Sequence, residues 1–201
     1  MAATATALRP AAAGHRARLT AGLAAAIAEK GYAAVTIADV VRGARVSKRT
    51  FYEHFADKEA CFLALYAETS DELLELIATS AATAPGLWEA RIGAAARTYF
   101  ERVAGEPELI RAALLEIQAA GPRARTLRRE VQRRHADQLR AFSEAAAAEE
   151  PGLAVLTPAL ATAVVGGLNE LMLEAVEAGH AERLGELAAA ATELIRAVLT
   201  R

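Results

Sequence analysis

The chain has 201 residues, of which 54% are hydrophobic but only 5% aromatic, and six are prolines. Alanine, the strongest intrinsic helix former, supplies much of the apolar content, and the β-branched and aromatic runs that mark strands are nearly absent. The composition excludes a mainly β protein and predicts an all-α fold of one domain or two small ones.

The net charge of −2 is unevenly distributed along the chain. Residues 1–60 hold nine Lys and Arg against five Asp and Glu, whereas residues 61–201 hold fourteen against twenty. A basic N-terminal segment on an acidic body is typical of a local nucleic-acid footprint, although chance alone can produce such unevenness. The single cysteine, Cys61, fits a reducing compartment. No signal-peptide order opens the chain, and prolines and glycines interrupt its longest uncharged stretch, 151–169. A cytoplasmic protein without a membrane span is expected.

The first predicted helix covers residues 15–30, after an expected disordered arm over residues 1–14. Leu19, Leu23 and Ile27 fall on one face of this helix because they recur every four residues. Gly31 then supplies the left-handed backbone that commonly ends a helix.

Two short helices and the start of a longer one follow. Thr36 and Asp39 resemble a capping box, with Asp in place of the usual Glu, and open a helix whose buried face is Val40, Val41 and Ala44. Ser47 is the expected N-cap of the next helix, and Asp57 caps a fourth that runs towards Ile77. The arrangement predicts a three-helix helix–turn–helix domain over residues 15–60.

A second helical domain is predicted over residues 61–201, joined to the first by the fourth helix. The stretch 79–86 reads TSAATAPG and is the clearest linker signal. Prolines at first-turn positions and glycines at helix ends bound the remaining segments. Their predicted ranges are 87–104, 107–119, 122–149, 157–178 and 181–200.

The third helix has the side chains that reading a DNA major groove requires. Phe51 and Phe55 point to the core, which turns a polar face outward. Arginine and lysine donate to guanine, threonine contacts thymine, and hydroxyl or imidazole groups bind phosphates. The predicted DNA contacts are Thr36, Arg45, Ser47, Lys48, Arg49, Thr50, Tyr52, His54 and Lys58. A basic helix face that is merely solvated is the alternative.

Here the sequence resembles the TetR family of transcriptional regulators over about 45 residues. That family shows a threonine, a short helix, an Ala-Gly-Val-Ser turn, and then Thr-Phe/Leu-Tyr-x-x-Phe-x-x-Lys-Glu. The matching residues are Thr36, Val40, Val41, Ala44, Val46, Ser47, Thr50, Phe51, Tyr52, Phe55, Lys58 and Glu59. The family's turn glycine is replaced by Arg45, which implies either about 1 kcal/mol of strain at a positive φ or a slightly different turn.

The resemblance implies that the C-terminal helices form a ligand pocket and a homodimer interface. Periodicity supports the dimer independently, because two apolar stripes follow coiled-coil-like spacing. The predicted interface residues are Leu160, Val164, Leu168 and Leu171, with Gly167 small enough for close helix approach, and then Leu184, Leu187, Ala191, Leu194 and Val198. The alternative is that both stripes bury inside one subunit.

The expected pocket is apolar with a few polar groups. Its candidate lining residues are Phe62, Tyr66, Trp88, Tyr99, Phe100, Glu116, His135, Phe142, Asn169 and Met172. Ordinary core packing is the alternative for each aromatic side chain. Six arginines between positions 123 and 134 indicate a solvated helix face. If the effector carries a carboxylate, one or two of these arginines would bind it.

No catalytic motif accompanies these features. The four histidines are scattered, and neither a glycine-rich phosphate loop nor a nucleophile elbow is present, so no enzyme, metal or cofactor is expected. The sequence therefore predicts a homodimeric DNA-binding regulator, a repressor of a pseudo-palindromic operator that a small-molecule effector releases. A helical structural or protein–protein interaction protein is the alternative.

Overall fold

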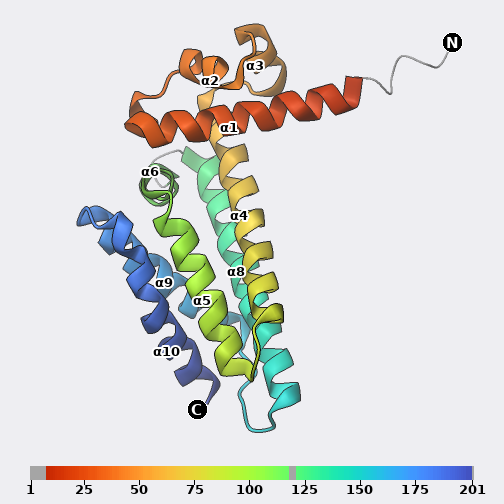
Figure 1. Cartoon of the computed structure of the whole chain (residues 1–201), viewed down its shortest axis with the longest axis vertical. Helices are drawn as coiled ribbons and strands as arrows, with labels where there is room; N and C mark the ends of the chain where they lie inside the picture. Colours follow the sequence, from red (N-terminus) through yellow and green to blue (C-terminus); the bar gives the residue numbers. More distant parts are fainter. Residues whose placement is uncertain (1–7, 118–120, 201) are drawn as a thin grey trace, which may run out of the picture. The chain divides into compact units, whose positions relative to one another are not determined.

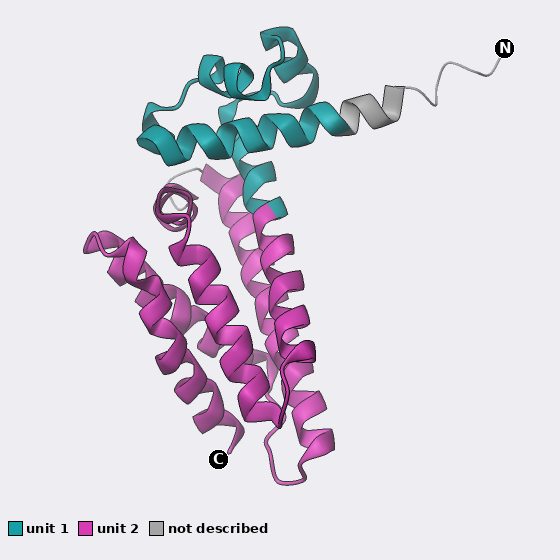
Figure 2. Ribbon diagram, in the orientation of Figure 1, with its two compact units in different colours: residues 1–68 teal, residues 69–201 magenta. Residues whose placement is uncertain are grey.

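The computed structural model describes residues 8–117 and 121–200, and the side chains of residues 14–117 and 121–200. It is all-α within these residues, as composition predicts. Two compact units divide the chain, residues 1–68 and residues 69–201 (Figure 2). The predicted boundary at residue 60 lies about two turns earlier, and both positions fall within one long helix.

The first unit contains α1 (Leu8–Ala34), α2 (Ile37–Ala44), α3 (Lys48–His54) and the start of α4 (Lys58–Thr83) (Figure 1). Gly31 interrupts α1 with a φ of 72° and a ψ of 152°, so the predicted positive φ is present. Of the expected arm, residues 1–7 lie outside the described residues, and α1 begins at Leu8. The predicted core is confirmed: Leu19, Leu23, Ile27, Val40, Phe51 and Phe55 are all buried.

Backbone contact between two glycines lets α1 and α2 cross closely. A Cβ atom added to Gly22 would lie 2.7 Å from the carbonyl oxygen of Val40 and 2.8 Å from the amide nitrogen of Ala44. A Cβ atom added to Gly43 would lie 3.3 Å from Cα of Gly22. Only glycine fits at Gly22 without a shift of the backbone, so this contact fixes where α2 sits on α1.

The second unit contains the rest of α4, α5 (Trp88–Ala104), α6 (Pro107–Arg111), η1 (Ala112–Glu116), α8 (Gly121–Glu149), α9 (Pro158–Glu177), η2 (Ala181–Glu186) and α10 (Leu187–Leu199). Thr157 caps α9, and Pro158 lies in its first turn, as predicted for this proline. Figure 1 shows α4 and α8 side by side, and within the second unit Gln138 Nε2 donates to the Leu74 carbonyl at 2.7 Å.

Three predicted elements of the second unit differ in the structure. The linker predicted over 79–86 is shorter in the structure, because α4 continues to Thr83 and only residues 84–87 separate it from α5; Thr98 Oγ1 of α5 donates to Ser80 Oγ at 2.8 Å. The helix predicted over 107–119 divides into α6 and the π-helical η1. The helix predicted over 181–200 begins as the 3₁₀ segment η2.

Two hydrophobic clusters fill the second unit. The first joins α5, α9, η2 and α10 around Phe100, Met172 and Leu184, which are each at most 1% exposed. The second gathers around Trp88, Leu156 and Leu199. Ser143 ties the 150–157 loop to this second cluster, because its buried hydroxyl accepts from the Leu156 amide at 3.0 Å and donates to the Arg140 carbonyl at 2.7 Å.

Candidate nucleic-acid interface

The start of α2 is held by the predicted capping box. The Asp39 amide donates to Thr36 Oγ1 at 3.3 Å, and the Thr36 amide donates to Asp39 Oδ2 at 2.9 Å. Lys30 Nζ of α1 lies 2.6 Å from the same carboxylate, and Arg42 lies 2.6 Å from its other oxygen. The hydrogen bonds from Lys30 and Thr36 hold the pKa of Asp39 well below its usual range. At neutral pH a charged carboxylate therefore fixes α2 to α1.

The turn between α2 and α3 keeps the left-handed geometry despite its arginine. Arg45 has a φ of 54° and a ψ of 47°, and among the described residues it is the only non-glycine with a positive φ. Its amide donates to the Arg42 carbonyl at 3.2 Å, and the Val46 amide donates to the Val41 carbonyl at 3.0 Å. These two bonds define a Schellman motif, so of the two expected alternatives the positive φ is the one present.

Helix α3 presents a polar face above an apolar anchor. Ser47 caps the helix, since its hydroxyl accepts from the Thr50 amide at 3.0 Å, and Phe51 is fully buried beneath. Lys48 and Arg49 are exposed, and so is 57% of Tyr52. Short helices with this division between faces are what major-groove recognition requires.

The remaining predicted contacts are arranged around this face. The Arg49 guanidinium pairs with Glu53 one turn later, at 3.1 Å, with its side chain 89% exposed. Thr50 is half-buried, and Thr36 lies exposed at the start of α2. His54 is half-buried, with its ring 6.2 Å from the ring of His15 on α1. Arg45 is exposed beside the turn.

Lys58 has a role inside the domain that the sequence did not reveal. Its ammonium donates to the carbonyls of Tyr32 and Val35, both at 2.9 Å, and lies 4.2 Å from the centroid of the Tyr32 ring. It thereby ties the start of α4 to the α1–α2 connection. These contacts give Lys58 a structural role, and the predicted phosphate contact stays a prediction.

The cysteine and the first two pocket candidates lie in this unit. Cys61 and Phe62 are fully buried, and the Phe62 ring is 4.5 Å from that of Tyr32, while Tyr66 is half-buried. Burial raises the pKa of the Cys61 thiol to about 12, with a smaller contribution from Glu68. Cys61 is thus a small core side chain that stays protonated, and Phe62 serves the core of the first unit.

Residues 19–65 match the family model described as bacterial regulatory proteins of the tetR family. This segment spans α1 from Leu19, the two short helices and the start of α4. The chain carries the DNA-binding domain of the TetR family. Its capping box, turn and α3 face are the parts of that domain described above.

Solved bacterial regulators share the fold over nearly the whole chain. A TetR-family transcriptional regulator from Pectobacterium atrosepticum is 25% identical, with a TM-score of 0.75 over 96% of this chain and 98% of the other. The fatty acid degradation regulator FadR from Bacillus halodurans is 19% identical, with a TM-score of 0.76 over 90% and 94%. FadR from Bacillus subtilis, solved with stearoyl-CoA, is 18% identical, with a TM-score of 0.75 over 91% and 98%. No curated protein matches the chain.

The pocket candidates do not gather around one space. Tyr99, Phe100 and Met172 belong to the first hydrophobic cluster, whereas Trp88 and Phe142 belong to the second. Trp88 Nε1 donates to Glu150 at 2.7 Å, which joins the start of α5 to the end of α8. Glu116 and Asn169 are half-buried, and Asn169 Nδ2 donates to the Val165 carbonyl of its own helix at 2.9 Å. Trp88 and Phe142 therefore pack in a different cluster from the other aromatics.

His135 and Ser70 are a half-buried and a buried polar residue of the second unit. The His135 ring is 6.2 Å from Tyr99, and its Nδ1 is 2.9 Å from the Val131 carbonyl, to which it donates as the neutral tautomer. Burial lowers the pKa of His135, so the ring is uncharged at neutral pH. The hydroxyl oxygen of Ser70, on α4, is buried without a hydrogen-bond partner. A serine inside an alanine-rich helix carries no sequence signal, and the prediction missed it.

The dimer candidates divide by exposure. Val164, Leu184 and Ala191 are at most 3% exposed within a single subunit, so for these three the alternative of burial inside one subunit is correct. Leu168 and Leu187 pack half-buried against the first cluster, and Leu160 and Val198 against the second. Gly167 is exposed, as are 39% of Leu171 and 36% of Leu194. The outward face of α9 also includes Ala163 and Gly166.

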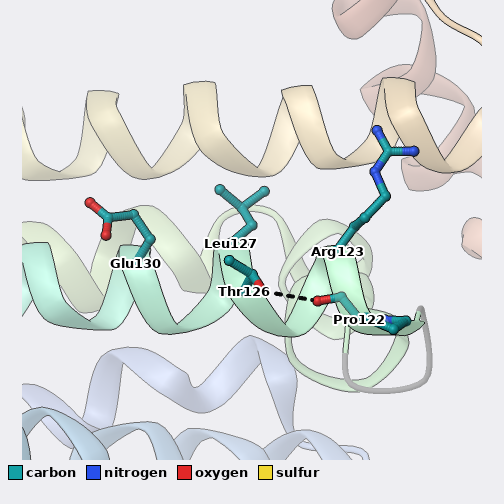
Figure 3. Close-up of a pocket in the computed structure, with 5 residues that line it drawn as sticks. All are labelled: Pro122, Arg123, Thr126, Leu127 and Glu130. Carbon is teal, nitrogen blue, oxygen red and sulfur yellow. Dashed lines mark hydrogen bonds between the residues drawn. The ribbon is translucent and has the colours of Figure 1, made fainter.

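The arginines of α8 differ between its two halves. Arg133 pairs with Glu130 and Asp137, Arg134 with Asp71, and Arg140 with Glu144. No carboxylate among the described residues pairs with those of the first half, which are Arg123, Arg125, Arg128 and Arg129. An open hollow of about 550 Å³ lies on this half, lined by Pro122, Arg123, Thr126, Leu127 and Glu130 (Figure 3).

Proposed function

We propose that the protein is a cytoplasmic, homodimeric, ligand-responsive repressor of transcription. The observation that supports DNA binding best is the exposed face of α3, with Lys48, Arg49 and Tyr52 outward and Phe51 anchored below. The match of residues 19–65 to the TetR-family model supports the same conclusion. In a dimer, two copies of α3 would enter successive major grooves, about 34 Å apart.

The proposed contacts fall into two groups by chemistry. Lys48, Arg49 and Thr50 are the base-reading side chains, and Arg49 would exchange its pairing with Glu53 for a guanine edge. Phosphate oxygens would be held by groups at the helix starts, in the turn and along α3. These groups are Thr36, Arg45, Ser47, Tyr52 and His54.

The experiment is selection of bound sequences from a random duplex library, followed by affinity measurement across a series of salt concentrations. We expect one enriched pseudo-palindrome and a steep fall in affinity with salt. Arg49→Ala should relax base preference at one position of each half-site, and Tyr52→Phe should weaken all sequences evenly. Arg97→Ala removes an exposed arginine of α5 and is the charge-matched control. No enriched sequence and no salt-dependent binding would leave the structural or protein–protein interaction alternative.

The proposed dimer forms through the outward face of α9, with a contribution from α10. Helix α9 is the one described helix that is long and apolar enough to cross a membrane, and 22% of its most apolar window is buried. A helix whose outer face packs against a second subunit is likewise apolar and largely exposed when one chain is considered alone. A Cβ atom added to Gly166 or Gly167 would have nothing within 4 Å, which leaves room for close approach of a partner helix.

Leu171→Glu tests this interface in sedimentation experiments. A charge placed on the exposed 39% of this side chain should shift the protein from dimer to monomer, because it would be desolvated in the dimer. Leu76→Glu is the matched control, since Leu76 is 41% exposed on α4 and lies outside the proposed interface. A full dimer with Leu171→Glu would contradict the proposed use of α9.

For the effector we propose an apolar molecule that also carries an anionic group. The first hydrophobic cluster offers the apolar surroundings, and neutral His135 and the Ser70 hydroxyl offer hydrogen bonds. Bacillus subtilis FadR was solved with stearoyl-CoA, and the four arginines of α8 without a carboxylate partner offer charge for such a head group. The effector would act by favouring a state in which the two α3 helices no longer match the operator spacing.

Thermal-shift titration with long-chain acyl-CoA, free CoA and the free fatty acid separates the two parts of this proposal. If the protein binds the acyl-CoA but neither free CoA nor the free fatty acid, binding needs both the apolar chain and the anionic head group. Loss of acyl-CoA binding in the double variant Arg123→Ala, Arg128→Ala would indicate that the head group lies on α8. No shift with any of the three compounds contradicts the proposed effector class and leaves the DNA-binding proposal standing.

A further inference from the structure

Arg45 occupies a backbone conformation that favours glycine, and Arg18 of α1 is the side chain that reaches it. Its Nη2 atom donates to the Ala44 carbonyl at 2.5 Å and to the Arg45 carbonyl at 2.8 Å. These carbonyls lie 26 and 27 residues from Arg18 in sequence. No local pattern around the turn indicates such a contact.

The two bonds satisfy acceptors that the end of α2 leaves open. The Schellman motif uses the carbonyls of Val41 and Arg42, but the Ala44 carbonyl receives no backbone donor among the described residues. A positive charge at a helix C-terminus also opposes the negative end of the helix dipole. Arg18 is therefore both a hydrogen-bond donor and a favourable charge for the last turn of α2.

The position of Arg18 follows from the crossing of α1 and α2. Arg18 precedes Gly22 by one helical turn and so lies on the same face of α1. Gly22 contacts the backbone of α2 at Val40 and Ala44. The glycine contact thus brings the guanidinium over the end of α2 and the turn.

We propose that Arg18 is a positioning residue that holds the helix–turn–helix turn in its left-handed form and thereby sets α3 for DNA. In this arrangement the turn does not need glycine, and the exposed Arg45 side chain remains available to a phosphate. The inference rests on the proposed DNA-binding function. Arg18 itself contacts protein carbonyls rather than DNA.

A double-mutant cycle tests the coupling between Arg18 and the turn. Arg18→Ala should weaken operator affinity about tenfold in the wild-type background, and about threefold or less with Arg45→Gly, because glycine adopts the turn without help. Comparing Arg18→Ala within each background cancels any effect that removal of the Arg45 side chain has on phosphate binding. Arg18→Gln retains a neutral donor and should give an intermediate loss in the wild-type background. Equal losses in both backgrounds would refute the proposal.

The salt dependence separates positioning from direct contact. A positioning residue leaves the slope of log affinity against log salt unchanged, whereas removal of a phosphate-binding side chain reduces it by about one. We expect an unchanged slope for Arg18→Ala and a reduced slope for Arg45→Gly. A slope reduced by about one in Arg18→Ala would assign Arg18 to the phosphates and overturn the proposal.

Hydrogen exchange provides a readout that needs no DNA. The amides of Arg45 and Val46, which close the Schellman motif, should exchange about tenfold faster in Arg18→Ala, and this increase should disappear with Arg45→Gly. Unchanged exchange would contradict the inference even if the protein binds its operator. Faster exchange in a protein that binds no DNA would instead contradict only the proposed function.

Discussion

Gly22→Ala tests whether the crossing of α1 and α2 depends on the absence of a side chain. The new Cβ atom would lie 2.7 Å and 2.8 Å from two backbone atoms of α2, which cannot rotate away as a side chain can. Overpacking of this kind costs roughly 1–3 kcal/mol, and the better helix propensity of alanine returns about 1 kcal/mol. The expected net loss is about 1 kcal/mol, or about 3 °C in Tm for a chain of this size.

Gly14→Ala is the matched control because it makes the same change in the same helix. A Cβ atom at Gly14 has nothing within 4 Å, so only the propensity gain of up to about 1 kcal/mol remains. Thermal unfolding followed by circular dichroism should therefore place Gly22→Ala below the wild type and Gly14→Ala at or above it. A Tm for Gly22→Ala equal to or above that of Gly14→Ala would refute the close-contact argument.

Three further predictions concern ionisable and buried groups. Because the folded protein lowers the pKa of Asp39, its carboxylate stabilises the fold at any pH above the ordinary pKa of about 3.9, and this stabilisation is lost as the pH falls below that value. Asp39→Asn should therefore lower Tm at pH 7 and make Tm depend less on pH in the acid range. Burial also lowers the pKa of His135, so the contribution of the neutral ring to stability is complete above about pH 6.5 and declines as the pH falls below that value. His135→Gln should therefore make the fall of Tm between pH 7 and 5 less steep, and a slope equal to that of the wild type would contradict this. Trp88→Phe removes the hydrogen bond to Glu150 and should cost about 1 kcal/mol in chemical unfolding, while a variant as stable as the wild type would mean that this partly exposed pair contributes nothing.

The helix–turn–helix domain was predictable because each of its signals is local. Thr36 and Asp39 are three residues apart, and Ser47 and Thr50 likewise, so the capping bonds can be read from neighbours in the chain. The buried position of Phe51 follows from helical spacing in the same way, whereas Phe55 is buried as the extended residue that ends α3. Arg45 shows the limit of this approach, since its left-handed backbone depends on a side chain from another helix.

The pocket and dimer residues were harder to predict because periodicity reports burial without naming the partner. Leu184 and Leu194 lie on one apolar stripe, yet Leu184 is fully buried in its own subunit and Leu194 is 36% exposed. Likewise Trp88 and Phe100 look equivalent in sequence but pack in separate clusters. Only the packing of α9, η2 and α10 on the rest of the unit separates these cases.

The sequence by itself determined the all-α class, the cap and turn positions, and the polar face of α3, since backbone propensity and short-range hydrogen bonds decide them. The tertiary structure decided which side chains serve each feature across long separations. Lys58 donates hydrogen bonds to the carbonyls of Tyr32 and Val35, and Arg18 donates to the carbonyl of Arg45 in a turn where glycine is usual. Such contacts depend on how helices cross, and in the first unit that crossing is set where Gly22 of α1 meets the backbone of α2.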